Sequence, residues 1–316
     1  MKRIKLNLAS FAMLFSIIIL ATACSKDDDN DVTPQTEPMA KSIVQIATED
    51  DNFSILEEAL VKANLVSALQ ADGPFTVFAP TNSAFEMLFE SLNVNGIDDL
   101  SAETLTPILL YHVLAGKAMS SDIATGYFET LSNATPDSKG IVLYAMVGNG
   151  VMINNSITVT QADISASNGV IHVIDKVMLP PTVVDLAIQN ANFSTLVAAV
   201  VKAGLVDALV AEGPFTIFAP TNAAFDAAFA ALNISGLNDL TAEALTPILL
   251  YHVVADNVLA SEVSAGMVPT LNTESNITVT VSEQGVMLDN TAKVIATDVQ
   301  GSNGVIHVID NVILPN

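Results

Sequence analysis

A phrase of thirteen residues occurs twice in this chain, and it constrains the fold more than any other feature. GPFTVFAPTNSAF occupies residues 73–85, and GPFTIFAPTNAAF occupies residues 213–225, at an offset of 140. A second matched pair, LTPILLYHVLA at residue 105 and LTPILLYHVVA at residue 245, keeps that offset. A unit of this length far exceeds a solenoid repeat, so the sequence predicts two tandem domains.

A third pair of segments shows where the two copies differ in length. SNGVIHVIDKVMLP at residue 167 returns as SNGVIHVIDNVILP at residue 302, at an offset of 135 instead of 140. The five-residue difference lies between Leu131 and Gly150, where the first copy carries SNATPDSKG. Surface loops tolerate length changes best, so a loop is predicted there. We expect four segments in the whole chain: a signal peptide at 1–23, an acidic tether at 24–41, and domains at 42–180 and 183–316.

The first 23 residues have the pattern of a lipoprotein export signal. A basic start is followed by an apolar run over residues 8–20, shorter than the roughly 20 apolar residues of a permanent membrane span. The run ends in Ala21-Thr22-Ala23-Cys24, which resembles a bacterial lipobox, although Ala21 departs from the usual leucine. Cys24 is the only cysteine in the chain, and we expect it to carry the lipid.

Charge limits the partners that this chain can bind. Cleavage before Cys24 removes three of eleven basic residues and no acidic ones, which leaves a formal charge of 8 − 34 = −26. Nucleic acid and anionic lipid head groups are therefore excluded as expected partners. The following run SKDDDNDVTPQTEP is typical of a solvated tether. Residues 25–29 also resemble the acidic signal that sends some lipoproteins to the outer face of the outer membrane.

Within each copy, helical spacing gives way to an extended pattern. A first helix is expected behind Asn52, ending at Asn64 or Gly204, the residue types that best tolerate a left-handed backbone. FTVFA is predicted to be a strand, and Thr81 or Asn82 to cap the next helix. The expected buried face of that helix is formed by Phe85, Leu88, Phe89 and Leu92. A later helix is expected to have Pro107 in its first turn, where a missing N–H costs little. ITVTQADI and VIHVID are predicted strands.

Three segments, present in this order in both copies, point to one family. TVFAPTNSAF, ILLYHVLAG and NGVIHVID resemble the signature segments of the fasciclin domain, and the resemblance covers residues 42–316. It implies an α+β fold with two tandem domains, each a wedge-shaped β-sandwich with helices packed on one side. It also implies a role in cell adhesion and the extracellular matrix.

Enzymatic alternatives find little support in the residues. The four histidines fall in apolar segments and form equivalent pairs: His112 with His252, and His172 with His307. Because no other ligand type stands at metal-binding spacing, hydrogen-bonded structural roles are favoured, and no cofactor, metal or catalytic residue is expected. No H-E-x-x-H, G-x-S-x-G, P-loop or G-x-G-x-x-G motif occurs. A hydrolase would need a deep polar cleft with converging titratable groups.

The expected function is that of a surface-anchored lipoprotein whose two domains bind an extracellular protein or polysaccharide without catalysis. The alternative is an accessory glycan- or small-ligand-binding lipoprotein of an outer-membrane complex. The expected location is the outer membrane, facing the cell exterior, with contact to the membrane through the lipid anchor alone.

The resemblance also implies candidate contacts, since an Asp-Ile-type motif and a Tyr-His segment are associated with integrin-mediated adhesion in animal matrix proteins of the family. The matching positions are Asp163, Ile164, Asp298, Val299, Tyr111, His112, Tyr251 and His252. An exposed carboxylate beside an aliphatic side chain offers charge and burial to a partner. The competing interpretation makes the aspartates turn or cap residues and the aliphatic residues core. Replacing both aspartates by alanine is expected to weaken partner binding without lowering thermal stability.

Overall fold

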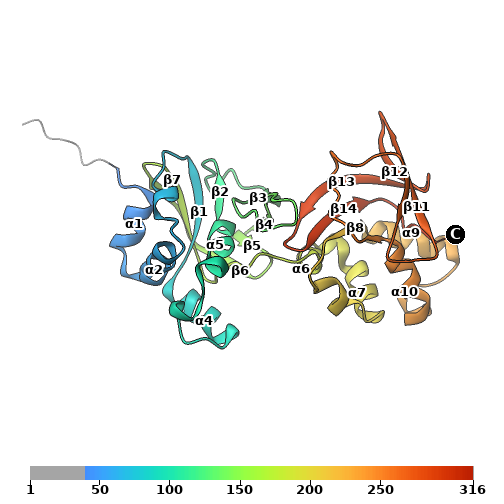
Figure 1. The fold of residues 1–316 in the computed structure, drawn as a ribbon, viewed down its shortest axis with the longest axis horizontal. Coiled ribbons are helices and arrows are strands. Elements are labelled where there is room, and N and C mark those ends of the chain that lie inside the picture. The colour runs from blue at the N-terminus through green and yellow to red at the C-terminus, as the bar shows by residue number, and fades with distance from the viewer. Residues whose placement is uncertain (1–39, 316) are drawn as a thin grey trace, which may run out of the picture. The chain divides into compact units, whose positions relative to one another are not determined.

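A computed structural model describes residues 40–315 of the chain. These residues form two domains of the same design, each a seven-stranded mixed sheet with helices. The α+β fold that the sequence predicts is confirmed (Figure 1). Among the described residues no single helix has the length and apolarity to cross a membrane, although the bent pair Val183–Gln189 and Ala191–Lys202 has them jointly.

The first domain contains five α-helices, and its helix and strand bounds are as follows. The helices are α1 (Ile43–Glu49), α2 (Ser54–Lys62), α3 (Val66–Leu69), α4 (Asn82–Leu92) and α5 (Ala102–Tyr111), with short 3-10 turns at Asp51–Phe53 and Ile97–Asp99. The strands are β1 (Phe75–Pro80), β2 (Val113–Ala115), β3 (Gly126–Glu129), β4 (Val142–Gly148), β5 (Gly150–Ile153), β6 (Ile157–Ala166) and β7 (Gly169–Ile174).

The second domain repeats these elements in the same order. Its helices are α6 (Val183–Gln189), α7 (Ser194–Lys202), α8 (Val206–Val210), α9 (Asn222–Leu232) and α10 (Ala242–Tyr251), with 3-10 turns at Ala191–Phe193 and Leu237–Asp239. Its strands are β8 (Phe215–Pro220), β9 (Val253–Val254), β10 (Gly266–Pro269), β11 (Asn276–Ser282), β12 (Gly285–Leu288), β13 (Ala292–Gln300) and β14 (Gly304–Ile309).

Each sheet is organised around one parallel pair of buried strands. The strand order is β2-β1-β7-β6-β5-β4-β3 in the first domain, and the second domain has the equivalent order β9-β8-β14-β13-β12-β11-β10. β1 lies parallel to β7, with Phe75 opposite Gly169, and all other neighbours are antiparallel. Every residue of β7 is buried, as the unbroken apolar run GVIHVI requires for a strand that is covered on both faces.

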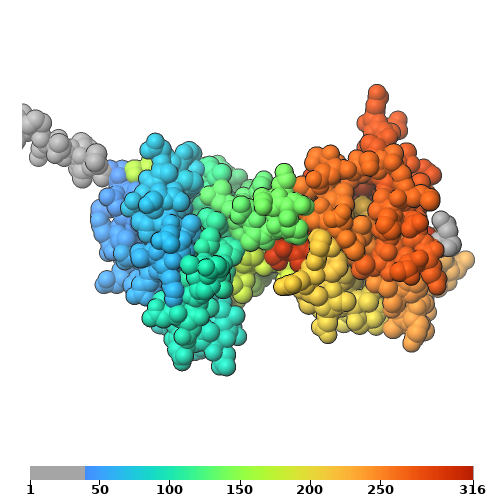
Figure 2. Space-filling view, viewed as in Figure 1, coloured from blue at the N-terminus to red at the C-terminus, as the bar shows by residue number. Residues whose placement is uncertain are grey.

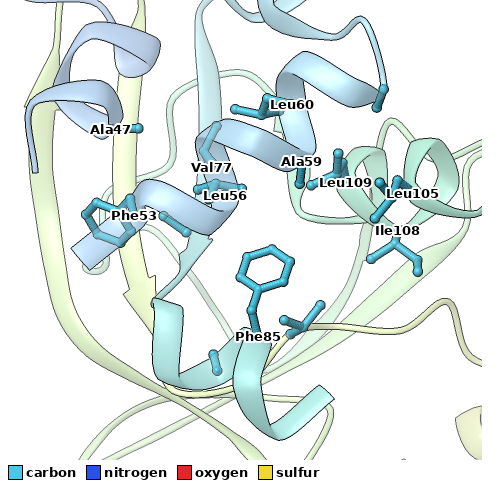
Figure 3. Packing of buried hydrophobic residues seen from close by; sticks show 14 of the residues in the cluster. Ala47, Phe53, Leu56, Ala59, Leu60, Val77, Phe85, Leu105, Ile108 and Leu109 are labelled. Carbon is cyan, nitrogen blue, oxygen red and sulfur yellow. The ribbon is translucent and has the colours of Figure 1, made fainter. Parts of the chain in front are cut away.

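Two apolar cores lie on opposite sides of this parallel pair. In the first domain the helix-side core joins α1, α2, α4 and α5 to the sheet, and the ring of Phe85 lies at its centre, between Leu56 and Ile108 (Figure 3). The other core fills the space within the folded sheet, and its largest members include Phe78, Tyr111 and Leu143. The second domain has the same two cores. Helices on one side and a folded sheet on the other give the wedge-shaped sandwich.

The repeated phrase builds this architecture with its two polar residues. Thr81 caps α4, because its hydroxyl accepts a hydrogen bond from the backbone N–H of Ala84 at 3.3 Å. Asn82, by contrast, reaches across the domain: its Oδ1 accepts from the N–H of Ile55 at 3.0 Å, and its Nδ2 donates to the carbonyl of Asp51 at 2.8 Å. The side chain thereby satisfies free backbone groups at the start of α2. The second copy repeats these bonds.

Several local predictions can be compared with the structure. The helix predicted behind Asn52 is α2, with α7 as its counterpart, and the left-handed positions after both are confirmed, with φ of 56° at Asn64 and 69° at Gly204. Leu92 was predicted to be buried, but it is 42% exposed because α4 ends there, at the left-handed residue Asn93. Pro107 does not lie in the first turn of its helix, since Ser101 caps α5 six residues earlier.

Candidate functional site

Asp163, the first candidate contact, lies at an irregularity of β6. The pairing register of β6 with β7 shifts between Gln161 and Ile164, and Asp163 has a left-handed φ of 65°. Its carboxylate turns to a neighbouring loop, where Oδ1 accepts from the N–H of Ser120 at 2.7 Å and Oδ2 accepts from the Ser120 hydroxyl at 2.6 Å. These hydrogen bonds from Ser120 lower the pKa of Asp163. The carboxylate therefore fastens a loop to a bulged strand.

The backbone of Asp163 extends this network to a buried histidine. The Asp163 N–H donates to Nδ1 of His172 at 3.2 Å, so Nε2 carries the ring proton and donates to the carbonyl of Ala118 at 2.9 Å. His172 lies in the central strand β7 and is completely buried. The bulge, the histidine and the loop at residues 118–120 thus form one connected unit.

The second domain builds the same unit with one bond fewer. Asp298 has a φ of 61°, and its Oδ1 accepts from the N–H of Ala260 at 2.8 Å. Ala260 occupies the position of Ser120 and has no hydroxyl to donate. His307 accepts from the Asp298 N–H at 3.4 Å and donates to the carbonyl of Val258 at 2.8 Å, and burial lowers its pKa. Asp298 itself is exposed.

The aliphatic neighbours of the two aspartates turn toward the interior. Ile164 is half-buried and packs against the helix-side core of the first domain. Val299 is 4% exposed and belongs to the helix-side core of the second domain. A partner at the bulge of the second domain would therefore contact Asp298 without reaching the side chain of Val299.

The Tyr-His segment of the first domain is buried and fully bonded. The hydroxyl of Tyr111 donates to the carbonyl of Val142 at 3.1 Å and accepts from Nδ2 of Asn154 at 3.0 Å. His112 donates from Nδ1 to the carbonyl of Ile108 at 2.7 Å, and its Nε2 accepts from the N–H of Met178 at 2.9 Å. Burial raises the pKa of Tyr111 and lowers that of His112 to about 4.

Its counterpart in the second domain has the same roles. The Tyr251 hydroxyl lies 2.9 Å from Oδ2 of Asp289 and 3.0 Å from the carbonyl of Asn276. His252 donates from Nδ1 to the carbonyl of Ile248 and accepts at Nε2 from the N–H of Ile313, and burial lowers its pKa to about 4. Burial raises the pKa of Tyr251. These four Tyr-His residues are thus out of reach of a partner in the folded domains.

The structure therefore divides the eight candidate contacts into two groups. Asp163, Asp298 and the half-buried Ile164 can be reached from solvent, whereas Val299 and both Tyr-His pairs are interior. Cys24, the candidate lipid-attachment residue, lies outside the described residues. The expectation that the aspartates do not affect stability disagrees with their hydrogen bonds, which hold the bulge to its loop.

A buried asparagine that the sequence did not single out holds each domain together. Asn168 lies just before β7, where its Oδ1 accepts from the N–H of Ile43 at 2.9 Å and its Nδ2 donates to the carbonyls of Leu69 and Ala71. Asn303 makes the same three bonds in the second domain. The signal was present in the identical SNG triplets, which the two copies share just before VIHVID.

Few side chains in the described part of the chain are placed to bind a metal ion or to act as a base. No group of three or more His, Cys, Asp or Glu side chains that could hold a metal ion occurs within residues 40–315. Both ring nitrogens of all four histidines are hydrogen-bonded to backbone groups. The histidines thus serve the fold and have no ring nitrogen free to act as a base.

Comparison with known proteins agrees with this architecture. The fasciclin domain family matches residues 51–180 and 191–315. Protein sll1483 of Synechocystis sp. is 52% identical over 174 residues, which are 55% of this chain and 93% of that protein. Human periostin and the pig transforming growth factor-beta-induced protein ig-h3 are each 31% identical over 87% of this chain, which spans only 31% and 38% of their respective lengths. With both copies of the domain matched, this chain belongs to the fasciclin domain family.

Proposed function

We propose that this protein is a surface-anchored adhesion lipoprotein whose two fasciclin domains bind an extracellular protein or polysaccharide. The observation that carries the proposal is the pair of fasciclin domains, which also occur in matrix proteins of the adhesion type such as periostin and ig-h3. The strongly acidic composition favours a neutral or basic partner over nucleic acid.

The side-chain chemistry supports binding rather than catalysis. The polar side chains that the two copies share, namely the paired histidines, Tyr111 with Tyr251, and Asn168 with Asn303, form hydrogen bonds that shape each domain. A general base or nucleophile must have a free atom that can reach a substrate. The reachable groups at the bulges are carboxylates that already accept hydrogen bonds from a loop.

The anchor is tested first by replacing Cys24 with serine. Two or more acyl chains make membrane attachment stable, so Cys24→Ser should release the protein from the membrane fraction or stop its maturation. The measurement is fractionation together with mass spectrometry of the purified protein. A wild-type protein without lipid, or a variant that remains in the membrane fraction, would refute the lipoprotein assignment.

The acidic run after Cys24 supports a location on the cell exterior. Deleting residues 26–29 should leave lipidation intact but hide the protein from protease added to whole cells. The full-length protein is the reference in the same experiment. Equal cleavage of the two forms would reduce this run to a plain tether.

Ligand class separates adhesion from the alternative of an accessory glycan- or small-ligand-binding lipoprotein. Attachment of cells to surfaces coated with the purified protein, and loss of that attachment in cells that lack it, supports adhesion. A glycan array that shows saturable binding, without any attachment, supports the alternative. The same measurements are made on asparagine variants of Asp163 and Asp298, the two candidates that solvent can reach. Asparagine is chosen because it tolerates the left-handed backbone and keeps the size of the side chain.

A further inference from the structure

The second domain contains an apolar cavity of about 130 Å³ between the helices α6, α7, α8 and α10 and the sheet. Its floor is formed by buried aliphatic side chains, among them Val183, Leu196 and Ile306. His252 is the only lining residue with a polar side chain, and both of its ring nitrogens are bonded to the backbone. A ligand in this cavity would therefore find apolar contacts and no free hydrogen-bonding partner.

The equivalent space in the first domain is nearly filled, at about 20 Å³. At the offset of 140, Leu60 stands where the second domain has Val200, and Ile43 stands where it has Val183. Figure 3 shows Leu60 projecting from α2 in the packed core of the first domain. Each exchange removes one methylene group from the second domain, so these two positions account for part of the extra space.

The mouth of the cavity also differs between the domains. Ile188 and Val201 line the cavity and are 57% and 61% exposed. α6 and α7, which carry them, lie in the yellow part of the surface in Figure 2. Val197, half-buried, completes the aliphatic rim, whereas the first domain has Thr48 and Glu57 at the positions of Ile188 and Val197. The apolar surface thus continues from the floor of the cavity to solvent.

We propose that this cavity binds the end of a single linear alkyl chain that carries a neutral head group. An apolar cavity of about 150 Å³ in another protein stays dry and binds benzene, so a cavity of 130 Å³ has room for a few carbon atoms. The exposed Ile188 and Val201 favour an extended chain over a compact ring, because only a chain reaches from the floor to the rim. The negative formal charge of the protein favours a neutral head group. The proposal is independent of the adhesive function.

The test uses the full-length protein and a series of 1-alkanols from butanol to decanol. Methyl NMR of labelled Val and Leu residues should show saturable shifts at Val183, Val200 and Leu196 and none in the first domain. The dissociation constant should fall about fourfold for each added methylene, the equivalent of about 0.8 kcal/mol, until the chain leaves the rim. Absence of saturable shifts, or equal shifts in both domains, would overturn the proposal.

Two variants and a control separate the cavity from the surface around it. Val200→Leu installs the residue of the first domain and should weaken alkanol binding at least tenfold, whereas Ile188→Thr should weaken long alkanols more than butanol. Val61→Thr changes the exposed valine of the first domain at the position of Val201 and should have no effect. Unchanged binding in Val200→Leu would contradict the proposal. So would binding to phosphatidylcholine vesicles without binding of free alkanols, since that result would assign the apolar rim to a membrane.

Discussion

The two domains share a frame of polar residues at equivalent positions, but the second fills that frame with smaller side chains. Both use an asparagine before the last strand, a histidine at the end of the Tyr-His helix, and an aspartate at the bulge. On α4 the first domain buries Leu88, where α9 has Ala228. The difference shows that hydrogen-bonded positions define this fold, whereas core volume is free to vary and can open a cavity.

The largest expected effect comes from a glycine at the centre of the frame. A Cβ at Gly169 would lie 2.1 Å from the carbonyl oxygen of Phe75, and one at Gly304 would lie 2.2 Å from that of Phe215. Because these contacts are with backbone, Gly169→Ala or Gly304→Ala should each lower the free energy of unfolding of its own domain by about 3 kcal/mol. Guanidinium denaturation followed by a probe in each domain measures the loss.

Gly148→Ala is the control, because nothing lies within 4 Å of a Cβ at that glycine. It should change stability by less than about 0.5 kcal/mol. Equal losses in Gly148→Ala and Gly169→Ala would show that the parallel pair is not the rigid centre of the domain.

Acid should destabilise both domains by a similar amount through His112 and His252. Burial lowers the pKa of each ring to about 4, from about 6.5 in an unfolded chain. The folded state therefore holds these rings neutral, and their contribution is fully present above pH 6.5. As pH falls from 6.5 to 4, only the unfolded state takes up the protons, so each domain should lose about 3 kcal/mol by pH 4.

Denaturation of each domain at pH 7, 5.5 and 4 measures this slope. His112→Gln should flatten the slope in the first domain only. His252→Gln should reduce the slope in the second domain only, where His307, whose pKa burial also lowers, keeps part of it. Both variants are less stable at pH 7. A slope that persists in His112→Gln would assign the acid sensitivity of that domain to its carboxylates.

Replacing the bulge aspartates should affect the stability of the two domains differently, whereas acid affects both. Asp163 accepts two hydrogen bonds from Ser120, whereas Asp298 accepts one from Ala260. Asp163→Ala should therefore cost about 2 kcal/mol and Asp298→Ala about 1 kcal/mol in thermal unfolding. In a Ser120→Ala background the loss from Asp163→Ala should shrink to that of Asp298→Ala. Equal losses in the wild-type background would show that the serine hydroxyl adds nothing.

Much of the fold could be predicted because its signals are local or repeated. The duplicated segments gave the domain organisation, and residue type gave the left-handed ends at Asn64 and Gly204. Helical spacing correctly predicted that Phe85 lies on the buried face of α4, but it did not predict the exposure of Leu92, since burial there depends on where the helix ends.

The candidate site was harder to predict because its bonds join distant parts of the chain. Asp163 and Ser120 are 43 residues apart, and Asn168 binds the N–H of Ile43 across 125 residues. No local pattern encodes such pairs. The sequence located the aspartate beside NGVIH, but only the fold shows that its carboxylate faces a loop and that Tyr111 is interior.

The smallest expected effect tests the difference in core volume directly. Leu60→Val gives the first domain the residue of the second, and it should cost about 1 kcal/mol because it removes one buried methylene and leaves a space. Val200→Leu should raise the stability of the second domain by up to about 1 kcal/mol, since the cavity has room for the added group. The midpoints of guanidinium unfolding measure both changes, provided that the dependence of the unfolding free energy on guanidinium concentration stays constant. A destabilised Val200→Leu would mean that the walls of the cavity cannot admit a leucine rotamer, and that the smaller side chains of the second domain are matched to a different backbone spacing.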